Sequence, residues 1–409
     1  MSETASASLS EFFTMSEIAG RKVLHPARKV GDWCVLDEGL AHTSIGTSAL
    51  CRQLFDREEL EYRGINIVDI LADWDHLDAA LLLVGDFPKK TEDEDFRTFT
   101  IRQFEVACGR ANELRSFKDK TDAVEFIMTA VILARGHFDR SEFNKDDRRQ
   151  VLGFVIANVA AAIACYFSSC DLTSNTQQSL FENSTTSHPF LEIFLGAAFD
   201  QPADIAAVEV LNKFLILHAE HGFNTSATVV RSVASAGGDP FAAVVAGMTA
   251  FKADLHGGAS QLVGELYDQI AATHGQVGDF INEAIKGHQK LMGFGGRARK
   301  YRDRQYHEPR VTYMRDMIRD SGQFEPIAKI AQISLDFYDT ADTHPYFTER
   351  KLFANADIFN GVLIRRVGFP PSMNTMLLCF SRLVGWLSHF FECKDRDVPI
   401  IRSVDLPNG

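Results

Sequence analysis

The sequence lacks the features that mark several specialised classes of protein. It has no run of about 20 consecutive apolar residues of the kind that spans a membrane, because the apolar stretch at 155–167 is too short and is interrupted by Asn158. Its seven cysteines include no CxxC pair, which argues against a zinc signature and a disulfide framework. No repeat of 20–50 residues is present. We therefore expect a soluble protein from a reducing compartment, with no membrane partner and no bound metal.

Positive charge is also scarce. The chain has 42 lysines and arginines against 55 aspartates and glutamates, a formal net charge of −13. That balance argues against nucleic-acid binding, in which basic side chains must displace counterions from phosphates. The N-terminal segment contains Glu3 and Glu11 but no arginine before Arg21, so it resembles neither a transit peptide nor a secretory signal. These features favour the cytoplasm.

What is present is ordinary globular composition with helical periodicity. Apolar residues make up 45% of the 409 positions, enough for a large core in two or three domains or one α-rich body. Apolar residues recur at three- and four-residue spacings, whereas the alternation typical of strands is nearly absent. We predict an all-α protein with a loose arm at 1–30, a short strand-like segment at 32–43 and a polar loop at 173–188. The clearest helical patterns are Thr121–Arg135, Arg149–Ser169, Ala203–His218 and Asp239–Ala250.

Two histidines, His218 and His221, lie three residues apart at the end of one of these helices. Residues at i and i+3 share a helix face, so a metal-binding pair is conceivable. The pattern is not HExxH, however, and no third ligand is suitably spaced. A hydrogen-bonded structural role is therefore favoured for either histidine alone.

Two glycine-containing segments have the character of ligand-binding loops. His256 is followed by two glycines, and the helical pattern beyond them offers free N–H groups to a ligand. The segment Gly293-Phe-Gly-Gly precedes an arginine-rich stretch at 297–319 but fits neither GxGxxG nor the P-loop, so no dinucleotide or ATP site is predicted. A glycine loop that leads into arginines suits a bound anion, whereas a solvated helix face is the alternative interpretation.

A single carboxylate, Asp357, stands among apolar residues in the segment Asn355-Ala-Asp-Ile-Phe-Asn-Gly. Such surroundings raise the pKa of a carboxyl group and allow it to act as a general base. The alternative is a helix N-cap, which is a common role for aspartate at the start of a helical pattern. Each of these signals is weak when taken singly, but their order along the chain is informative.

That order resembles the citrate synthase family, and the resemblance covers most of the chain, from about Thr47 to Trp386. The segments that carry it, at approximately the family's spacing, are Tyr62-Arg-Gly, His218-Ala-Glu-His221, the turn at His256, the loop at 293–296, Glu308-Pro-Arg310, Asp357 and Ser381-Arg382.

The resemblance implies a fold, partners and a reaction. The family has a large helical domain and a smaller helical domain that closes over the substrates, and it forms obligate homodimers. Here the large domain would comprise 31–232 and 346–409, the small domain 233–345, and the N-terminal arm 1–30. The enzyme would be an acyltransferase that condenses an acyl-CoA with oxaloacetate and then hydrolyses the thioester. It would need no cofactor besides the CoA of its substrate.

The resemblance also implies roles for individual residues. Asp357 would take the α-proton of the acyl-CoA, and His256 would donate a hydrogen bond to the thioester oxygen. An enolate needs such a base and donor, and a dicarboxylate needs cationic partners. The residues that would hold oxaloacetate are His221, Arg310, Arg382 and Arg402 of the partner subunit. The residues that would contact CoA are Leu255, Gly293, Gly295 and Arg297.

The sequence departs from the family pattern at the position that polarises the ketone of oxaloacetate. The family has a histidine directly after Gly-Phe-Gly, but this chain has Gly296, and about five additional residues precede Glu308. The usual Gly-Ala-Asn after the histidine turn is Gly-Ala-Ser260, and Arg402 is followed by Ser403 where the family has proline. Loss of one polarising donor typically lowers a rate on the order of 10²–10³-fold.

Gly296 has three interpretations. In the first, the enzyme accepts a larger acyl group, for which the glycine makes room, as in the alkylcitrate synthases. In the second, it is an ordinary citrate or 2-methylcitrate synthase in which His307 or a water replaces the lost histidine. In the third, it is a catalytically impaired homologue that binds substrates or only hydrolyses a thioester. His307 is also a candidate polariser under the first interpretation.

Overall fold

The chain divides into two compact units, residues 1–47 with 402–409 and residues 48–401. The computed structural model describes residues 13–18, 21–26, 43–54, 57–86, 93–138, 147–173, 186–253, 256–273, 276–295 and 307–402. All the described helices belong to the larger unit.

The smaller unit contains an antiparallel hairpin of β1 (Phe13–Ile18) and β2 (Arg21–Pro26). The sequence predicted a loose arm in this region, because two short strands present too few alternating positions to be distinguished from coil. Residues 32–42 of the predicted strand-like segment and 174–185 of the predicted polar loop lie outside the described residues.

The larger unit begins with a small sheet that contacts a later helix. Its strands are β3 (Cys51–Leu54), β4 (Glu59–Tyr62) and β5 (Ile65–Asn66), antiparallel in the order β3-β4-β5. Tyr62 is fully buried, and its hydroxyl donates a hydrogen bond of 2.9 Å to the carbonyl of Ile216 in α9 (Ile205–His218). The sheet therefore packs against the end of α9.

Five of the next helices begin after an aspartate that caps the first turn. Asp75, Asp122, Asp147, Asp204 and Asp239 each accept hydrogen bonds from the backbone of the turn after them. The described helices of this stretch are α2 (Ile67–Asp73), α3 (His76–Val84), α4 (Asp93–Glu113), α5 (Ala123–His137), α6 (Arg148–Phe167), α8 (Pro189–Phe199), α9, α10 (Thr225–Ser235) and α11 (Pro240–Lys252), with a 3₁₀ turn at Arg115–Lys120. The bounds of α5, α6, α9 and α11 confirm the four helices that the sequence predicted.

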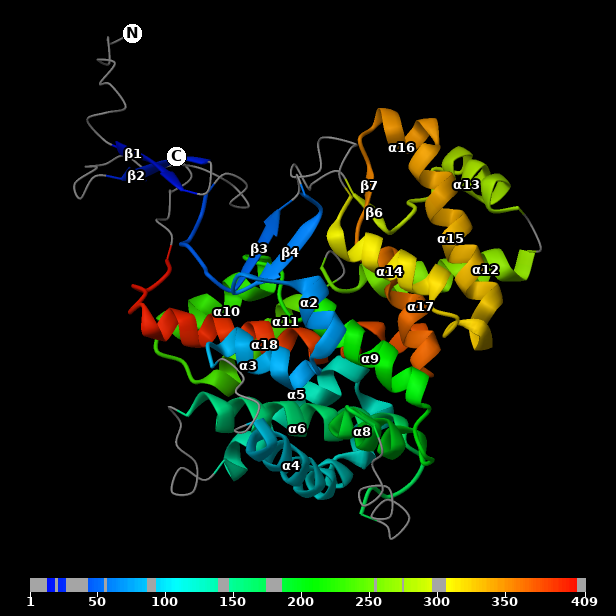
Figure 1. The fold of residues 1–409 in the computed structure, drawn as a ribbon. Helices are drawn as coiled ribbons and strands as arrows, with labels where there is room; N and C mark the ends of the chain where they lie inside the picture. The colour runs from blue at the N-terminus through cyan, green and yellow to red at the C-terminus, as the bar shows by residue number, and fades with distance from the viewer. Residues whose placement is uncertain are drawn as a thin grey trace. The chain divides into compact units, whose positions relative to one another are not determined.

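Helix α6 lies at the centre of this assembly. Every residue from Val151 to Cys165 is buried, and α4, α5, α8 and α18 (Asn374–Asp395) pack against it (Figure 1). A helix that is apolar on all sides requires such a position. Among the described residues it is the one helix long and apolar enough to cross a membrane, but 83% of its apolar window is buried within the fold, as is typical of a core helix.

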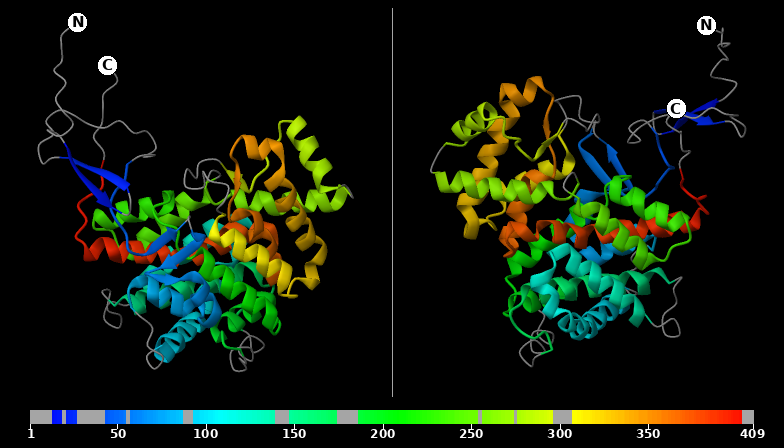
Figure 2. Two further views of the ribbon diagram at one scale, coloured as in Figure 1. Left: turned by 45° about the horizontal axis from the view of Figure 1, so that its top comes forward. Right: turned by 180° about the vertical axis from the view of Figure 1, so that it is seen from behind.

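The remaining helices gather on the side of the larger unit away from α4 and α6 (Figures 1 and 2). They are α12 (Ala259–Thr273), α13 (Val277–Lys286), α14 (Pro309–Asp320), α15 (Ala328–Thr343), α16 (Pro345–Glu349) and α17 (Asp357–Val367), with 3₁₀ turns at Glu325–Ile327 and Pro371–Met373. Strands β6 (Phe294–Gly295) and β7 (Phe353–Ala354) pair antiparallel beside them. The prediction of an all-α fold is confirmed.

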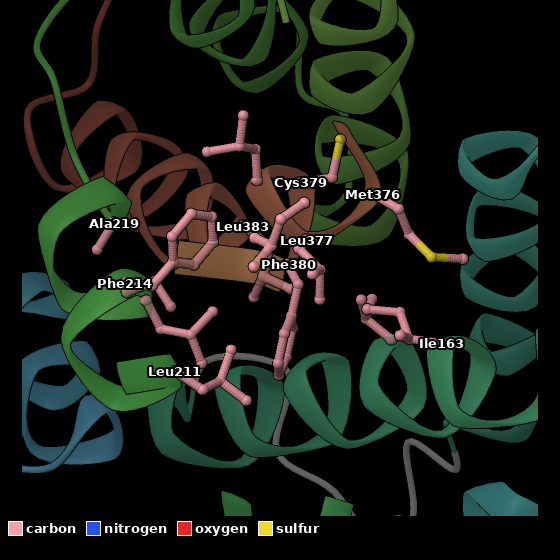
Figure 3. Close-up of a cluster of buried hydrophobic side chains, with 14 of the residues drawn as sticks. Ile163, Leu211, Phe214, Ala219, Met376, Leu377, Cys379, Phe380 and Leu383 are labelled. Atoms are coloured by element: carbon pink, nitrogen blue, oxygen red, sulfur yellow. The ribbon is translucent and has the colours of Figure 1, made fainter. Parts of the chain in front are cut away.

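Helix α18 connects the core to the candidate site. Leu377, Phe380 and Leu383 are buried on its apolar side and lie beside Leu211 and Phe214 of α9 (Figure 3). Arg382, between Phe380 and Leu383 on α18, donates a hydrogen bond to the carbonyl of His218, where α9 ends. The packing of α9 against α18 therefore determines where the polar residues of that turn lie.

The two compact units of the chain have their boundaries at residues 47 and 402. The predicted boundaries of the small domain, after 232 and after 345, fall within α10 and at the start of α16. The large domain and closing small domain therefore stay a prediction.

Candidate active site

Polar side chains from three parts of the larger unit meet just after α9. That helix ends at His218, and the ring of His221 comes three residues later. Nδ1 of His221 is in hydrogen-bonding contact with the side-chain amide of Gln53 in β3. Nε2 of the same ring lies 3.4 Å from Nη2 of Arg310 in α14. His221 is thus held between the small sheet and a helix more than 80 residues further along the chain.

Arg310 is oriented by the residue that caps its own helix. Glu308 is the N-cap of α14, and its Oε1 accepts hydrogen bonds from the backbone N–H of Arg310 at 3.4 Å and from its Nε at 2.7 Å. Both side chains are buried, so water competes little with this ion pair. The pair leaves the Nη side of the guanidinium directed toward His221.

A second buried arginine, Arg382, comes from α18. Its Nε donates a hydrogen bond of 2.8 Å to the carbonyl of His218, whereas its Nη1 is buried with no hydrogen-bond partner among the described residues. Leaving such a donor unpaired is costly, and an unpaired buried donor in a native protein calls for an explanation such as a bound ligand. Burial lowers the pKa of Arg382, and the carboxylate of Glu220 opposes that shift. The guanidinium remains charged and available to an anion.

The turn after α9 is packed tightly against α18 at a glycine. A Cβ atom on Gly385 would lie less than 3.0 Å from the carbonyl oxygen of Ala219 and from Oε2 of Glu220, a separation that real Cβ atoms essentially never show. Glu220 is completely buried, and its Oε1 lies 3.0 Å from Nε2 of His389. Glycine at 385 therefore allows α18 to bring Arg382 against the carbonyl of His218.

His256 is held by a serine from the start of α10. Its Nε2 lies 3.1 Å from Oγ of Ser226 and accepts a longer bond, of 3.4 Å, from the backbone N–H of that residue. The ring of His256 is thus anchored through Nε2 to both the hydroxyl and the backbone of Ser226. Burial, assisted by Arg382, lowers the pKa of His256 to about 4. The imidazole is therefore neutral near pH 7 and has one N–H to donate.

Asp357 is the first residue of α17 and does not cap it. The N-cap position belongs to Ala356, so the cap that the sequence offered as an alternative role is wrong. Oδ1 of Asp357 accepts a hydrogen bond from the hydroxyl of Ser260 in α12. Burial raises the pKa of Asp357; Ser260 and Arg310 are the largest opposing influences. A carboxylate in this state is suited to accept a proton from a weak carbon acid.

Electrostatic effects show that these groups share one site. Arg382 acts on the pKa values of both His256 and Asp357, and Arg310 acts on that of Asp357. Together with the contact between Arg310 and His221, these effects bring five of the residues singled out in the sequence into one region.

The glycine loop reaches this region on the side of α12 and α17. Gly293 has a φ of +87°, in the left-handed range that favours glycine, and a Cβ there would touch Val263 of α12 and Ile358 of α17. Its carbonyl accepts a hydrogen bond of 2.9 Å from the backbone N–H of Asn355, two residues before Asp357. Gly295 lies in β6.

Four sequence-predicted residues are not placed at the site by the structure. Leu255, Gly296 and Arg297 lie outside the described residues. Gly296 is the position at which the family has its ketone-polarising histidine. Arg402 is exposed and belongs to the smaller unit.

His307 is anchored in the larger unit. Its backbone N–H donates a hydrogen bond of 2.8 Å to Oε1 of Glu58, and its Nδ1 lies 3.2 Å from the hydroxyl of Tyr338 in α15. It directly precedes Glu308, the residue that orients Arg310.

Several residues of the site had no signal in the sequence. Gln53, Glu220, Ser226 and Asn360 act through partners that are distant in the chain, for example 168 residues between Gln53 and His221. Glu220 and Asn360 lie within two segments that the sequence analysis quoted, His218-Ala-Glu-His221 and 355–361, which is the one hint that the sequence contained. The prediction for His218 is consistent with its geometry, because Nδ1 bonds the carbonyl of Phe214 at 2.9 Å. Among the described residues, no group of three or more histidines, cysteines or acidic residues is arranged to hold a metal ion.

Comparison with known proteins gives a consistent result. A family model described as "Citrate synthase, C-terminal domain" matches residues 39–403. A citrate synthase from Thermoplasma acidophilum is 26% identical over 376 residues, which cover 90% of this chain and 93% of that protein.

Solved structures of similar fold include three from this group of enzymes. The ternary complex of carboxymethyl coenzyme A and oxaloacetate with the citrate synthase from Thermoplasma acidophilum has a TM-score of 0.75 at 24% identity, covering 92% of this chain and 96% of that one. The citrate synthases from Pyrobaculum aerophilum and Thermotoga maritima have TM-scores of 0.74 and 0.71, each at 22% identity. They cover 97% and 92% of this chain, and 95% and 96% of their own chains.

Proposed function

The chain belongs to the citrate synthase family, and from that premise we propose that it condenses an acyl-CoA with oxaloacetate and hydrolyses the product thioester, releasing CoA. The observation that carries the proposal is the meeting of a carboxylate of raised pKa, a neutral histidine with one N–H to donate, and two buried arginines. The substrates named for the solved complex of the Thermoplasma enzyme, oxaloacetate and a CoA analogue, support the same pair here.

The first step is proton transfer from carbon. Asp357 removes a proton from the carbon next to the thioester, and the N–H of His256 donates to the thioester oxygen as negative charge develops there. Because His256 is neutral near pH 7, its ring carries one N–H, which can donate to the thioester oxygen throughout this step. The enol or enolate then attacks the ketone carbon of oxaloacetate, forming a C–C bond while the ketone oxygen becomes an alkoxide and takes up a proton. Water finally cleaves the thioester to a carboxylate and free CoA.

The arginines hold the second substrate. Arg382 presents an unpaired Nη1, and Arg310 presents the Nη side of a guanidinium whose Nε is occupied by Glu308. Two forked cations at one site match the two carboxylates of oxaloacetate. His221, fixed by Gln53 and Arg310, adds a polar ring beside them.

The acyl group is the finer part of the proposal. Because Gly296 stands where the family has its ketone-polarising histidine, we propose a substrate larger than acetyl-CoA, for which the glycine provides room, and an alkylcitrate as product. The ordinary citrate or 2-methylcitrate synthase is the second candidate, favoured by His307, which contacts the Tyr338 hydroxyl and directly precedes the residue that orients Arg310. Homodimerisation, with Arg402 of the partner subunit completing the site, is part of the same proposal.

Product mass spectrometry tests this function. The pure protein is incubated with oxaloacetate and acyl-CoAs from acetyl to decanoyl, and thiol release is followed in parallel. A condensed product from long acyl groups with little from acetyl-CoA supports the alkylcitrate synthase, whereas mainly citrate or methylcitrate supports the second candidate. Thiol release without a condensed product contradicts both.

The variant Asp357→Asn provides the matched control for that assay. We expect it to abolish condensation while oxaloacetate binding, measured by calorimetry, stays close to that of the wild type, because the arginines are separate from the base. Turnover that survives in Asp357→Asn would remove Asp357 from the mechanism.

A further inference from the structure

We infer that Ser260 and Asn360 form a positioning pair that commits Oδ1 of Asp357 to hydrogen bonding and leaves Oδ2 as the oxygen that takes the substrate proton. The inference rests on the proposed function, since it concerns how the proposed base is oriented. Neither residue was singled out as a catalytic or binding group in the sequence.

The hydrogen positions in this cluster are determined by its donors. Nδ2 of Asn360 donates to Oγ of Ser260 at 2.9 Å. A hydroxyl that accepts one hydrogen bond still has its own hydrogen to donate, and the acceptor within reach of Ser260 is Oδ1 of Asp357. Nδ2 of Asn360 makes a second, longer contact of 3.5 Å with the same oxygen. Oδ1 therefore receives two donors, and among the described residues no donor is found at Oδ2.

The orientation of the Asn360 amide is itself informative. Its Oδ1 is buried on the side of His218, whose side chain interacts with Asn360. Rotating the amide by 180° would replace the donor that contacts Oδ1 of Asp357 with an acceptor. The observed orientation therefore directs a donor toward the carboxylate of Asp357, as an ionised base requires.

The pair is held in place by close backbone packing. A Cβ on Gly361 of α17 would lie 3.0 Å from Cα of Gly264 in α12, so the two helices approach closely at these glycines. Gly264 lies one turn beyond Ser260, and Gly361 lies one turn beyond Asp357, so residues on the same faces meet. Tyr267 strengthens this contact by donating to the carbonyl of Ile358 at 2.7 Å. Ser260 and Asn360 are both buried, which leaves their side chains little freedom.

Other charged groups around Asp357 act on its ionisation but do not select an oxygen. Glu308 and Arg310 face it from α14, and Arg382 faces it from α18. His218 of α9, which interacts with Asn360, is neutral because burial lowers its pKa to about 3. Ser260 is the donor in direct contact with the carboxylate, so its removal tests the pair while these charges remain.

The test compares Ser260→Ala with Ser334→Ala in the full-length protein. Ser334 is also fully buried on a helix and donates from its hydroxyl to a backbone carbonyl, of Ala331 at 2.7 Å, which makes it a matched control for the loss of a buried hydroxyl. We expect Ser260→Ala to lower kcat on the order of 10- to 100-fold, with KM for oxaloacetate within about twofold, because the base is misdirected while the arginines are intact. We also expect the acidic limb of the kcat–pH profile of Ser260→Ala to shift to higher pH, because the hydrogen bond from Ser260 lowers the pKa of Asp357. Ser260→Thr, which keeps a hydroxyl, should restore part of the activity.

A second readout works without turnover. Infrared titration of protein labelled with ¹³C at aspartate carboxyl groups follows Asp357 directly, and Asp357→Asn identifies its band. We expect Ser260→Ala to move the titration of this band to higher pH and Ser334→Ala to leave it in place. If the wild type forms no condensed product, the proposed function fails, yet the titration still decides whether Ser260 governs Asp357. An unmoved band, or a kcat and pH profile for Ser260→Ala like those of Ser334→Ala, would overturn the inference.

Discussion

Replacing Gly385 by alanine should displace α18 from the turn that carries His221. The new Cβ would meet the carbonyl oxygen of Ala219 and Oε2 of Glu220 at less than 3.0 Å, whereas ordinary contact begins at 3.4 Å. The carbonyl belongs to the backbone and the carboxylate is buried and bonded to His389, so neither can move aside by a change of rotamer. The helix itself must shift, by a distance on the order of 1 Å in a core packed to crystal-like density.

The expected cost is large enough to measure. Overpacking of this kind destabilises a protein by about 3 kcal/mol at the upper end of its usual range. An unfolding entropy of about 2.1 cal/mol/K per residue, applied to the whole chain, converts this to a fall in Tm of roughly 3–4 °C. Arg382 lies one turn before Gly385, so it moves with the helix, and kcat/KM for oxaloacetate should fall on the order of 100-fold.

Gly136→Ala is the matched control. Gly136 lies in the last turn of α5, is exposed, and has nothing within 4 Å of an added Cβ. Alanine there should raise stability by about 0.5 kcal/mol, because glycine is the poorer helix former. Thermal and urea unfolding of both variants, with kinetics at fixed acyl-CoA, compare the two substitutions. A Gly385→Ala protein as stable and as active as Gly136→Ala would refute the packing argument.

Two further predictions concern charge. Arg382→Lys should raise KM for oxaloacetate on the order of 10- to 100-fold, because an ammonium cannot bond the carbonyl of His218 and offer a second planar donor at once; steady-state kinetics that leave KM unchanged would exclude Arg382 from the site. Burial lowers the pKa of His76 to about 4. Between pH 6.5 and 4 this histidine is therefore protonated in the unfolded chain but not in the native state, so the free energy of unfolding falls as the pH drops through this range. His76→Leu should reduce that loss by about 1.4 kcal/mol for each pH unit below 6.5, as measured by urea unfolding between pH 8 and 5. If the stability of the variant fell as steeply as that of the wild type, native His76 would be protonated in this range.

Local patterns in the sequence were sufficient for the helices. The segment from Arg149 to Ser169 predicted α6 because its apolar residues, at three- and four-residue spacings, all lie within one stretch of the chain. Strands of two to four residues, such as β3 to β5, escaped prediction, since each contributes too few positions for an alternating pattern and pairs only through its neighbours.

The site was predictable to the extent that its residues stand in recognisable motifs. His256 and Asp357 were found in this way, and the raised pKa of Asp357 agrees with the apolar surroundings that the sequence showed. Gln53 and Asn360 were not found, because each is an ordinary polar residue until the fold brings it to His221 or to Ser260. The role of Asp357 as a helix cap was a reasonable alternative, but α17 begins at Asp357 itself, so the cap position falls one residue earlier, at Ala356.

The position of α6 has a consequence for how the chain is made. During synthesis its apolar surface emerges long before α18, which supplies part of its cover and begins only at residue 374. Until that last helix arrives, α6 exposes apolar surface to other nascent chains and to chaperones, as incompletely folded large proteins do. A chain that contains α6 but is cut short before α18 should therefore aggregate and be cleared by proteases, so that nonsense mutations between these two helices remove the protein from the cell instead of leaving an inactive fragment.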